Sequence, residues 1–137
     1  MDRKRLVLLQ LPVPQHNQYK KTLNIPLAPA WIALGLKELK EWEVYVLSQE
    51  HATYLGDKAI LDHIISLEPD AIGLSLYLWN TDRSLYLAWR LKELLGTKVI
   101  IGGPEVTGDN PYIERPWIDL MVVGEGEGVI RDILSRK

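Results

Sequence analysis

Three turns rich in small residues follow apolar runs that have the character of buried strands, and they offer the best place in this chain for ligand chemistry. Their sequences are Ser75 after residues 71–74, Gly102-Gly103-Pro104-Glu105 after residues 98–101, and Gly124-Glu125-Gly126-Glu127 after residues 120–123. In a parallel α/β sheet, strand ends of one polarity share an edge, and such folds bind ligands at that edge. Because small residues let a flat ligand or a phosphate approach the backbone, this pattern predicts a ligand-binding module.

The residue types at these turns suit binding better than catalysis. The chain has no cysteine, which excludes a disulfide framework, thiol catalysis and any zinc or iron–sulfur cluster held by its own thiolates. A phosphoacceptor domain would need acidic residues after the first and third strands, where this sequence has Pro12-Val13-Pro14 and Tyr77-Leu78-Trp79. Neither G-x-x-x-x-G-K-[ST] nor G-x-G-x-x-G follows the first strand, so phosphoryl transfer and dinucleotide binding are not predicted.

Length and composition set the broad class. The chain has 137 residues, of which 47% are apolar, enough for one domain with a full core. Net charge is −2, so no electrostatic case for nucleic acid exists, and we expect the basic run Arg3-Lys4-Arg5 to be a solvated lead-in to the first strand. No apolar run approaches the ~20 residues of a membrane span, and no signal-peptide pattern opens the chain, so we expect no membrane partner and a cytoplasmic location.

Apolar runs alternate with stretches of helical periodicity along the chain. Strands are predicted at residues 6–11, 43–47, 71–76, 98–101 and 120–123, and helices from Pro29 onward, at 56–67, from the cap candidates Asn80, Thr81 and Asp82 to Leu95, and at 127–135. We expect Gly35 to lie in mid-helix and Gly96 to stop the third helix. The alternation predicts an α/β, flavodoxin-like (Rossmann-like) three-layer sandwich over residues 1–137, with a five-stranded parallel sheet in the order 2-1-3-4-5.

Five segments, taken together in order, carry a resemblance to a known family. They are Leu8-Leu9-Gln10-Leu11-Pro12, Pro26-Leu27-Ala28-Pro29, Pro69-Asp70-Ala71-Ile72-Gly73-Leu74-Ser75, Gly102-Gly103-Pro104-Glu105, and the run from Asp119 through Val123 to Gly124-Glu125-Gly126-Glu127. In order and spacing the chain resembles the N-terminal cobalamin-binding domain of cobalamin-dependent radical S-adenosylmethionine enzymes. The resemblance covers nearly the whole chain.

The resemblance implies where the cofactor would lie. The corrinoid would cover the carboxyl edge of the sheet, and its nucleotide tail with the benzimidazole base would pass between the third and fourth strands. The cofactor-binding residues implied in this way are Ser75, Tyr77, Gly102, Gly103, Pro104, Glu105, Gly124, Glu125 and Gly126. Their types fit, since a serine can hydrogen-bond a buried base, glycines leave room for the tail, and the helix start after Gly124 offers free N–H groups. A plain strand–loop turn at Gly102-Gly103, and simple complementation of a helix dipole by Glu125 and Glu127, are the alternative interpretations.

The sequence departs from the wider cobalamin-binding group in one respect. Methionine-synthase-like members carry Asp-x-His-x-x-Gly after the first strand, with the histidine on cobalt. Here His16 lies in the corresponding loop, but Pro14 and Tyr19 stand at the Asp and Gly positions. We therefore expect His16, His51 and His63 to be solvated or packed, with no metal-ligating residue in this chain.

The radical half of such an enzyme is missing from these 137 residues. Its Cys-x-x-x-Cys-x-x-Cys run would hold an iron–sulfur cluster that cleaves S-adenosylmethionine, and this chain has no cysteine. We expect binding without catalytic residues here, and a C-terminal radical catalytic domain of methyltransferase or anaerobic Mg-protoporphyrin monomethyl ester cyclase type as the partner. Apolar loop residues at the predicted edge, Val13, Tyr77, Leu78, Trp79 and Val106, would face that domain. The alternative is a flavodoxin-like interaction domain that has lost the cofactor.

Overall fold

The chain folds into a five-stranded sheet with helices on both faces. The computed structural model describes residues 3–12, 27–48, 51–52, 55–124 and 127–135. Its elements are the strands β1 (Lys4–Leu9), β2 (Trp42–Val46), β3 (Ala71–Ser75), β4 (Lys98–Gly102) and β5 (Leu120–Met121), the helices α1 (Leu27–Gly35), α3 (Asp57–Ser66), α4 (Thr81–Leu95) and α5 (Glu127–Ser135), and the 3-10 turn η1 (Pro111–Ile113). All neighbouring strands are parallel in the order β2-β1-β3-β4-β5, which confirms the predicted flavodoxin-like topology.

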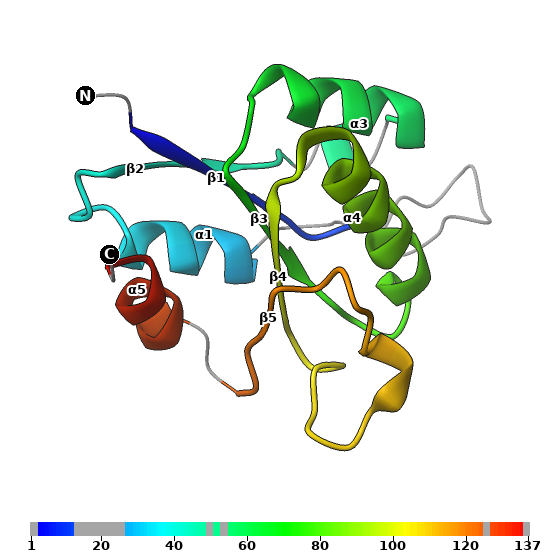
Figure 1. The fold of residues 1–137 in the computed structure, drawn as a ribbon. Helices are drawn as coiled ribbons and strands as arrows, with labels where there is room; N and C mark the ends of the chain where they lie inside the picture. The colour runs from blue at the N-terminus through cyan, green and yellow to red at the C-terminus, as the bar shows by residue number, and fades with distance from the viewer. Residues whose placement is uncertain (1–2, 13–26, 49–50, 53–54, 125–126, 136–137) are drawn as a thin grey trace, which may run out of the picture.

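The layers are distributed evenly over the sheet. Helices α1 and α5 cover one face, and α3 and α4 cover the other (Figure 1). Each face has its own apolar core, because successive side chains of a strand point to opposite sides. On β1, for example, Leu6 and Leu8 belong to the α1/α5 side, whereas Val7 and Leu9 belong to the α3/α4 side.

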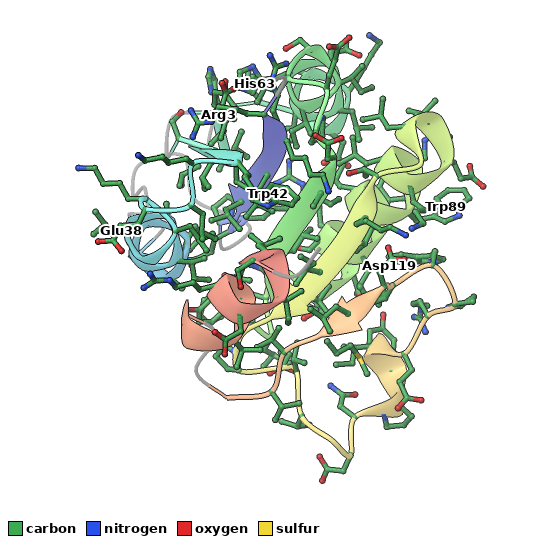
Figure 2. All side chains as sticks on the ribbon, turned by 60° about the vertical axis from the view of Figure 1, so that its left-hand side comes forward. Arg3, Glu38, Trp42, His63, Trp89 and Asp119 are labelled. Atoms are coloured by element: carbon green, nitrogen blue, oxygen red, sulfur yellow. The ribbon has the colours of Figure 1, made fainter. Side chains whose placement is uncertain are left out.

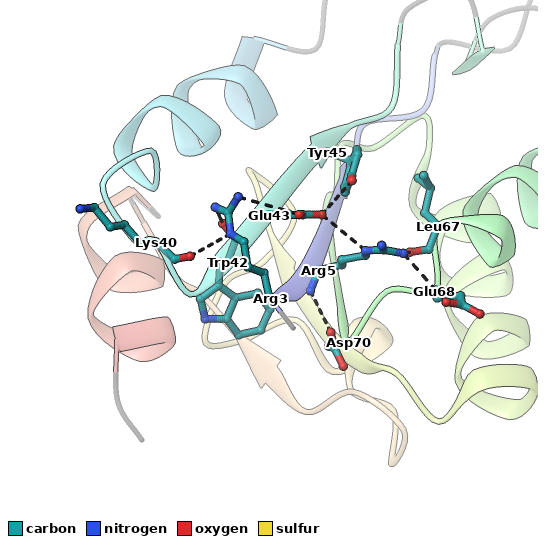
Figure 3. A network of polar contacts seen from close by, with 9 residues as sticks. All are labelled: Arg3, Arg5, Lys40, Trp42, Glu43, Tyr45, Leu67, Glu68 and Asp70. Carbon is teal, nitrogen blue, oxygen red and sulfur yellow. Dashed lines mark hydrogen bonds and ion pairs between the residues drawn. The ribbon is translucent and has the colours of Figure 1, made fainter. Parts of the chain in front are cut away.

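The amino ends of the strands are held by a polar network (Figure 3). The Arg5 N–H donates to Asp70 Oδ2 at 2.8 Å, and its guanidinium donates to the Leu67 carbonyl at 2.9 Å. Arg3 and Arg5 both form ion pairs with Glu43, at 3.8 and 3.5 Å. Arg3 and Lys4 are exposed and Arg5 is partly exposed, as expected of a solvated lead-in, and the two arginines in addition tie β1 to β2 and to the turn before β3.

Helix ends differ in part from the sequence prediction. Gly96 ends α4 with φ 65°, in the left-handed region that glycine adopts at little cost, as predicted. Gly35 is the last residue of α1, and the stripe residues Leu36 and Leu39 follow in turns, so its expected mid-helix position was wrong. Helical spacing alone could not place this end, because turns also bury residues at intervals of three.

Candidate ligand-binding site

A cavity of about 500 Å³ opens at the carboxyl edge of the sheet, on the side covered by α1 and α5. Its walls come from every described layer on that side: Leu8 of β1, Ala28, Pro29 and Ile32 of α1, Gly73 and Ser75 of β3, Ile100 and Gly102 of β4, Val122 to Gly124 after β5, and Ile130 of α5. Toward the amino ends of the strands, α5 is tied to the turn after α1 and to β2: Arg131 pairs with Glu38 at 3.1 Å, and Trp42 Nε1 donates to the Leu134 carbonyl at 3.2 Å. Figure 2 labels Glu38 and Trp42 on this side of the sheet. The cavity is therefore closed toward the amino ends of the strands and open toward their carboxyl ends.

Alternation of large and small residues on β3 creates the floor of this cavity. Ile72, Leu74 and Leu76 point into the α3/α4 core, whereas Gly73 and Ser75 point to the cavity side. Gly102 lies beside Ser75 on β4, in the same register and on the same face. A Cβ added at Gly102 would lie 3.8 Å from the nearest atom, the Val122 carbonyl oxygen, so a side chain at this position would have room to extend into the cavity.

Ser75 brings a polar atom to the end of β3 in a mainly apolar cavity, which Tyr77 and Thr107 also line. Its side chain is 7% exposed, and among the described residues its hydroxyl makes no hydrogen bond. A serine hydroxyl can both donate and accept a hydrogen bond. The arrangement suits a ligand group that offers a hydrogen-bond acceptor or donor deep in the cavity.

Gly103 lines the cavity and also makes a close contact with the backbone. Its φ of 102° is in the left-handed region, and an added Cβ would lie 2.6 Å from the Leu76 carbonyl oxygen and 2.7 Å from the Leu76 nitrogen. The missing side chain makes room mainly for the backbone that follows β3. A larger residue at Gly103 would disturb this crossing before it filled the cavity, and so Gly102 is the position where the space can be tested.

Asn80 holds the edge together and was not recognised from the sequence. It is 1% exposed; its Nδ2 donates to the carbonyls of Leu11 (3.0 Å) and Ser75 (3.2 Å), and its Oδ1 accepts the Tyr77 N–H at 2.8 Å. It occupies the N-cap position of α4, as the sequence suggested, but its side chain makes no capping bond to the helix. It instead ties the chain after β1 to the end of β3, and thereby positions Ser75 and Tyr77.

The mouth of the cavity presents aromatic and apolar side chains. Tyr77, half-buried, is stacked on Trp79 with ring centroids 4.8 Å apart. Leu78 is 80% exposed and Val123 is 61% exposed. Val106 is 2% exposed and packs into the α3/α4 core, so its expected place on an exposed edge was wrong. Val13 lies outside the described residues.

The structure brings together six of the nine predicted site residues. Those that line the cavity are Ser75, Tyr77, Gly102, Gly103, Pro104 and Gly124. Glu105 is not among the lining residues; its N–H donates to the Leu76 carbonyl at 3.2 Å and its carbonyl accepts from Asn110. Glu125 and Gly126 lie outside the described residues. The prediction omitted Gly73 and the apolar walls, although the alternation of large and small residues over 72–76 was visible in the sequence.

The electrostatics of the described cavity lining are neutral. None of its lining residues is a carboxylate, a histidine or a basic side chain. The rings of His63 and His51 lie 4.3 Å apart between centroids and are tilted by 46°. Burial together with the neighbouring imidazole lowers the pKa of His63, but His63 lies on α3, across the sheet from the cavity. Among the residues described, no cluster of three or more histidine, cysteine or acidic residues could hold a metal ion. The cavity can bind an apolar group with a few polar atoms, and its described residues offer no acid or base.

A comparison with family models identifies the chain. The model of the B12 binding domain matches residues 21–134, and the chain belongs to this family. It is 39% identical over 74 residues to the 2-(S-pantetheinyl)-carbapenam-3-carboxylate methyltransferase of Streptantibioticus cattleyicolor, and 36% identical over 75 residues to the cobalamin-dependent radical SAM methyltransferase TokK of Streptomyces tokunonensis. These matches cover 51% and 52% of this chain and 11% of each relative.

A third relative matches a longer part of the chain. The anaerobic magnesium-protoporphyrin IX monomethyl ester cyclase of Rubrivivax gelatinosus is 27% identical over 114 residues, 78% of this chain and 20% of that protein. The chain thus spans about a tenth to a fifth of the length of these relatives.

Solved structures support the same fold. The cobalamin-dependent S-adenosylmethionine radical enzyme OxsB with aqua-cobalamin bound superimposes with a TM-score of 0.71, at 18% identity, over 97% of this chain and 18% of OxsB. The CheY-like protein tadZ from Pseudomonas aeruginosa superimposes with a TM-score of 0.61 at 14% identity, over 100% of this chain and 97% of tadZ. At these identities the likeness concerns the fold. Within the described residues, no helix is long and apolar enough to cross a membrane.

Proposed function

We propose that this chain binds cobalamin, with the nucleotide tail in the cavity on the α1/α5 side of the sheet and the corrin ring over its carboxyl edge. The observation that carries the proposal is the Ser75 hydroxyl on the wall of a mainly apolar cavity, between the glycine positions 73 and 102, where no other described residue forms a hydrogen bond with it. Membership of the B12 binding domain family supports it.

The size of the cavity decides which part of cobalamin it would take. A volume of about 500 Å³ is in the range of pockets that enclose a ligand of a few tens of atoms. It suits an aromatic base with its sugar, whereas a whole corrin ring with its side chains needs a wider surface. The ring would therefore lie outside, against the residues at the mouth.

Individual residues have distinct parts in this proposal. The Ser75 hydroxyl would hydrogen-bond the base of the tail, and Gly102 would leave space for the tail to pass. Tyr77, with Trp79 stacked on it, offers a flat surface at the mouth, and Pro104 and Gly124 complete the rim. The described cavity lining contains no histidine, so none of these residues would ligate cobalt, and a corrinoid bound here would supply the cobalt chemistry itself.

A titration with hydroxocobalamin, followed by absorbance and calorimetry, tests the proposal. Gly102→Leu should weaken binding at least 100-fold, because its side chain fills the cavity, while the circular dichroism spectrum stays unchanged. Ser75→Ala should weaken binding about tenfold, the value of one hydrogen bond of ~1.4 kcal/mol. Gly108→Leu is the matched control: no atom lies within 4 Å of a Cβ there, and Gly108 does not line the cavity, so binding should not change.

If Gly102→Leu binds cobalamin as the wild type does, the tail does not enter the cavity. If the wild-type chain itself does not bind, a flavodoxin-like interaction domain without the cofactor takes the place of this proposal. His16→Ala should leave the spectrum of the bound cofactor unchanged, and a spectral shift would make His16 a cobalt ligand.

The exposed apolar residues beside the cavity mouth are suited to contact a second domain of a longer enzyme. Leu78 and Val123 are largely exposed beside the mouth, and such apolar groups are usually covered by a partner. We propose that these residues contact a radical catalytic domain, which would hold the iron–sulfur cluster and S-adenosylmethionine. The whole protein would be of methyltransferase or cyclase type. Sequencing the gene beyond the codon of Lys137 tests this: a Cys-x-x-x-Cys-x-x-Cys motif is expected, and a coding region without one would overturn it.

A further inference from the structure

Among the strands that the structure describes, β2 is an edge strand with β1 as its one neighbour. The two pair in a continuous register from Lys4 with Trp42 to Leu8 with Val46. The Glu41 carbonyl accepts from Lys4 and the Leu47 N–H donates to Leu8, so the odd-numbered residues of this stretch turn their backbone groups toward β1. The groups of Trp42, Val44 and Val46 consequently point away from the sheet. Among the described residues, those of Val44 and Val46 have no hydrogen-bond partner.

A groove runs along this open edge, on the side of α1. Its volume is about 670 Å³, and Ala30, Ala33 and Leu34 of α1 face Val44 and Val46 of β2 across it. Leu34 is 62% exposed. Helix α1 has no charged residue between Leu27 and Gly35, whereas a helix on the surface of a domain normally has a polar outer face. Backbone groups and apolar side chains are thus presented together, which is what an added strand requires.

The sequence of β2 is complementary to itself in one antiparallel register. With Val44 opposite Val44 of a second copy, Trp42 lies opposite Val46, and Glu43 lies opposite Tyr45. No like charges meet directly, and Glu43 is already neutralised by the nearby Arg3 and Arg5. Within one chain the Tyr45 hydroxyl already donates to Glu43 at 2.9 Å, so the same two groups are compatible across the seam.

We propose that two copies of this chain associate through β2, which makes one continuous ten-stranded sheet. Val44 of each copy would donate to and accept from Val44 of the other, and the Leu34 side chains would close the seam above it. Arg3 limits the register, because its guanidinium donates to the carbonyls of Lys40 and Trp42, and the Trp42 N–H donates to Leu39. The seam is therefore short and centred on Val44. It lies at the opposite side of α1 from the cavity mouth, and so it does not depend on cobalamin.

Sedimentation velocity and light scattering over about 5–500 µM protein test the proposal. The wild type should pass from 15.7 kDa to twice that mass as its concentration rises. Val44→Pro should stay monomeric throughout, since proline removes an outward N–H and leaves the β1 ladder intact. Leu34→Glu should weaken association at least tenfold. Leu94→Glu is the matched control, because Leu94 is 51% exposed on α4 at the far face, and it should dimerise as the wild type does.

Circular dichroism of each variant separates loss of association from loss of folding; if Val44→Pro does not fold, Leu34→Glu decides the matter. A wild type that is monomeric at 500 µM would overturn the proposal, as would a folded Leu34→Glu that associates like the wild type. A dimer that Leu94→Glu abolishes would place the interface on α4 and equally contradict it.

Discussion

The two faces of the central sheet are built from alternate residues of the same strands, yet they are filled differently. On the α3/α4 side, large aliphatic residues such as Ile72, Leu74 and Ile101 are almost fully buried and pack beneath helices that are also joined by the 2.6 Å ion pair between Arg83 and Asp57. On the α1/α5 side, the same stretch of β3 and β4 offers Gly73, Ser75 and Gly102, and a cavity remains. One face is closely packed, whereas on the other face a cavity takes the place of part of the packing.

Two adjacent isoleucines on β4 provide the most direct test of the difference in packing between the two faces. Ile101→Ala on the packed face should lower the free energy of unfolding by about 3–5 kcal/mol, because it opens a void in a close-packed core. Ile100→Ala should cost about half as much, since Ile100 is 6% exposed and belongs to the core on the cavity side, whereas Ile101 is fully buried in the α3/α4 core. Urea unfolding monitored by circular dichroism measures both values. Equal costs would show that the two faces are packed alike.

Asn80 offers a second test, at the rim that joins the two faces. Asn80→Ala should lower the free energy of unfolding by about 2–3 kcal/mol, because two carbonyls and one N–H lose a buried partner. It should also weaken cobalamin binding, since Ser75 and Tyr77 lose their support, whereas Gly102→Leu should weaken binding alone. Asn110→Ala is the control: that side chain bonds only within its own loop, at Glu105 and Tyr112, and about 1 kcal/mol or less is expected. Equal losses for the two variants would mean that the buried bonds of Asn80 do not hold the rim.

Acid should loosen the packed side at its rim before it affects the cavity. Burial raises the pKa of Asp119, but hydrogen bonds from Lys92 and the Val99 N–H, with the charges of Lys92 and Lys98, outweigh burial and hold that pKa below its ordinary value of 3.8. Because the folded pKa is lowered, the carboxylate contributes stability that is complete above the unfolded pKa and is lost as pH falls through the folded pKa.

We therefore expect urea midpoints to fall as pH decreases below about 4, and to fall less steeply for Asp119→Asn. Lys92 Nζ lies 2.6 Å from Asp119 and joins α4 to the start of β5, so the loss should appear at this junction (Figure 2). The exposed pair Lys58–Asp62 serves as a control, and Asp62→Asn should leave the acid dependence almost unchanged. The same pH slope in wild type and Asp119→Asn would show that this carboxylate does not govern the loss.

Most of the fold could be predicted from the sequence. Strand and helix alternation was enough for the parallel order 2-1-3-4-5, because right-handed crossovers and burial of both sheet faces leave few topologies. It also placed Ser75, Gly102 and Gly124 at one edge, since parallel strands end on the same side. The end of α1 at Gly35 could not be predicted, because the turn residues Leu36 and Leu39 are spaced like the buried residues of a helix.

By itself, the sequence determined which residues are small and at which edge they fall. Only the tertiary structure decided what occupies the space that each missing side chain leaves. At Gly103 the missing side chain admits the backbone of Leu76, and at Gly102 it leaves space in the cavity; the two neighbours cannot be told apart until the strand next to them is placed. Likewise Asn80 reads locally as a helix cap, but its partners Leu11 and Ser75 are 69 and 5 residues away, and only folding brings them within reach of one buried amide. Contacts between residues far apart in the chain depend on packing, which local patterns of residue type do not contain.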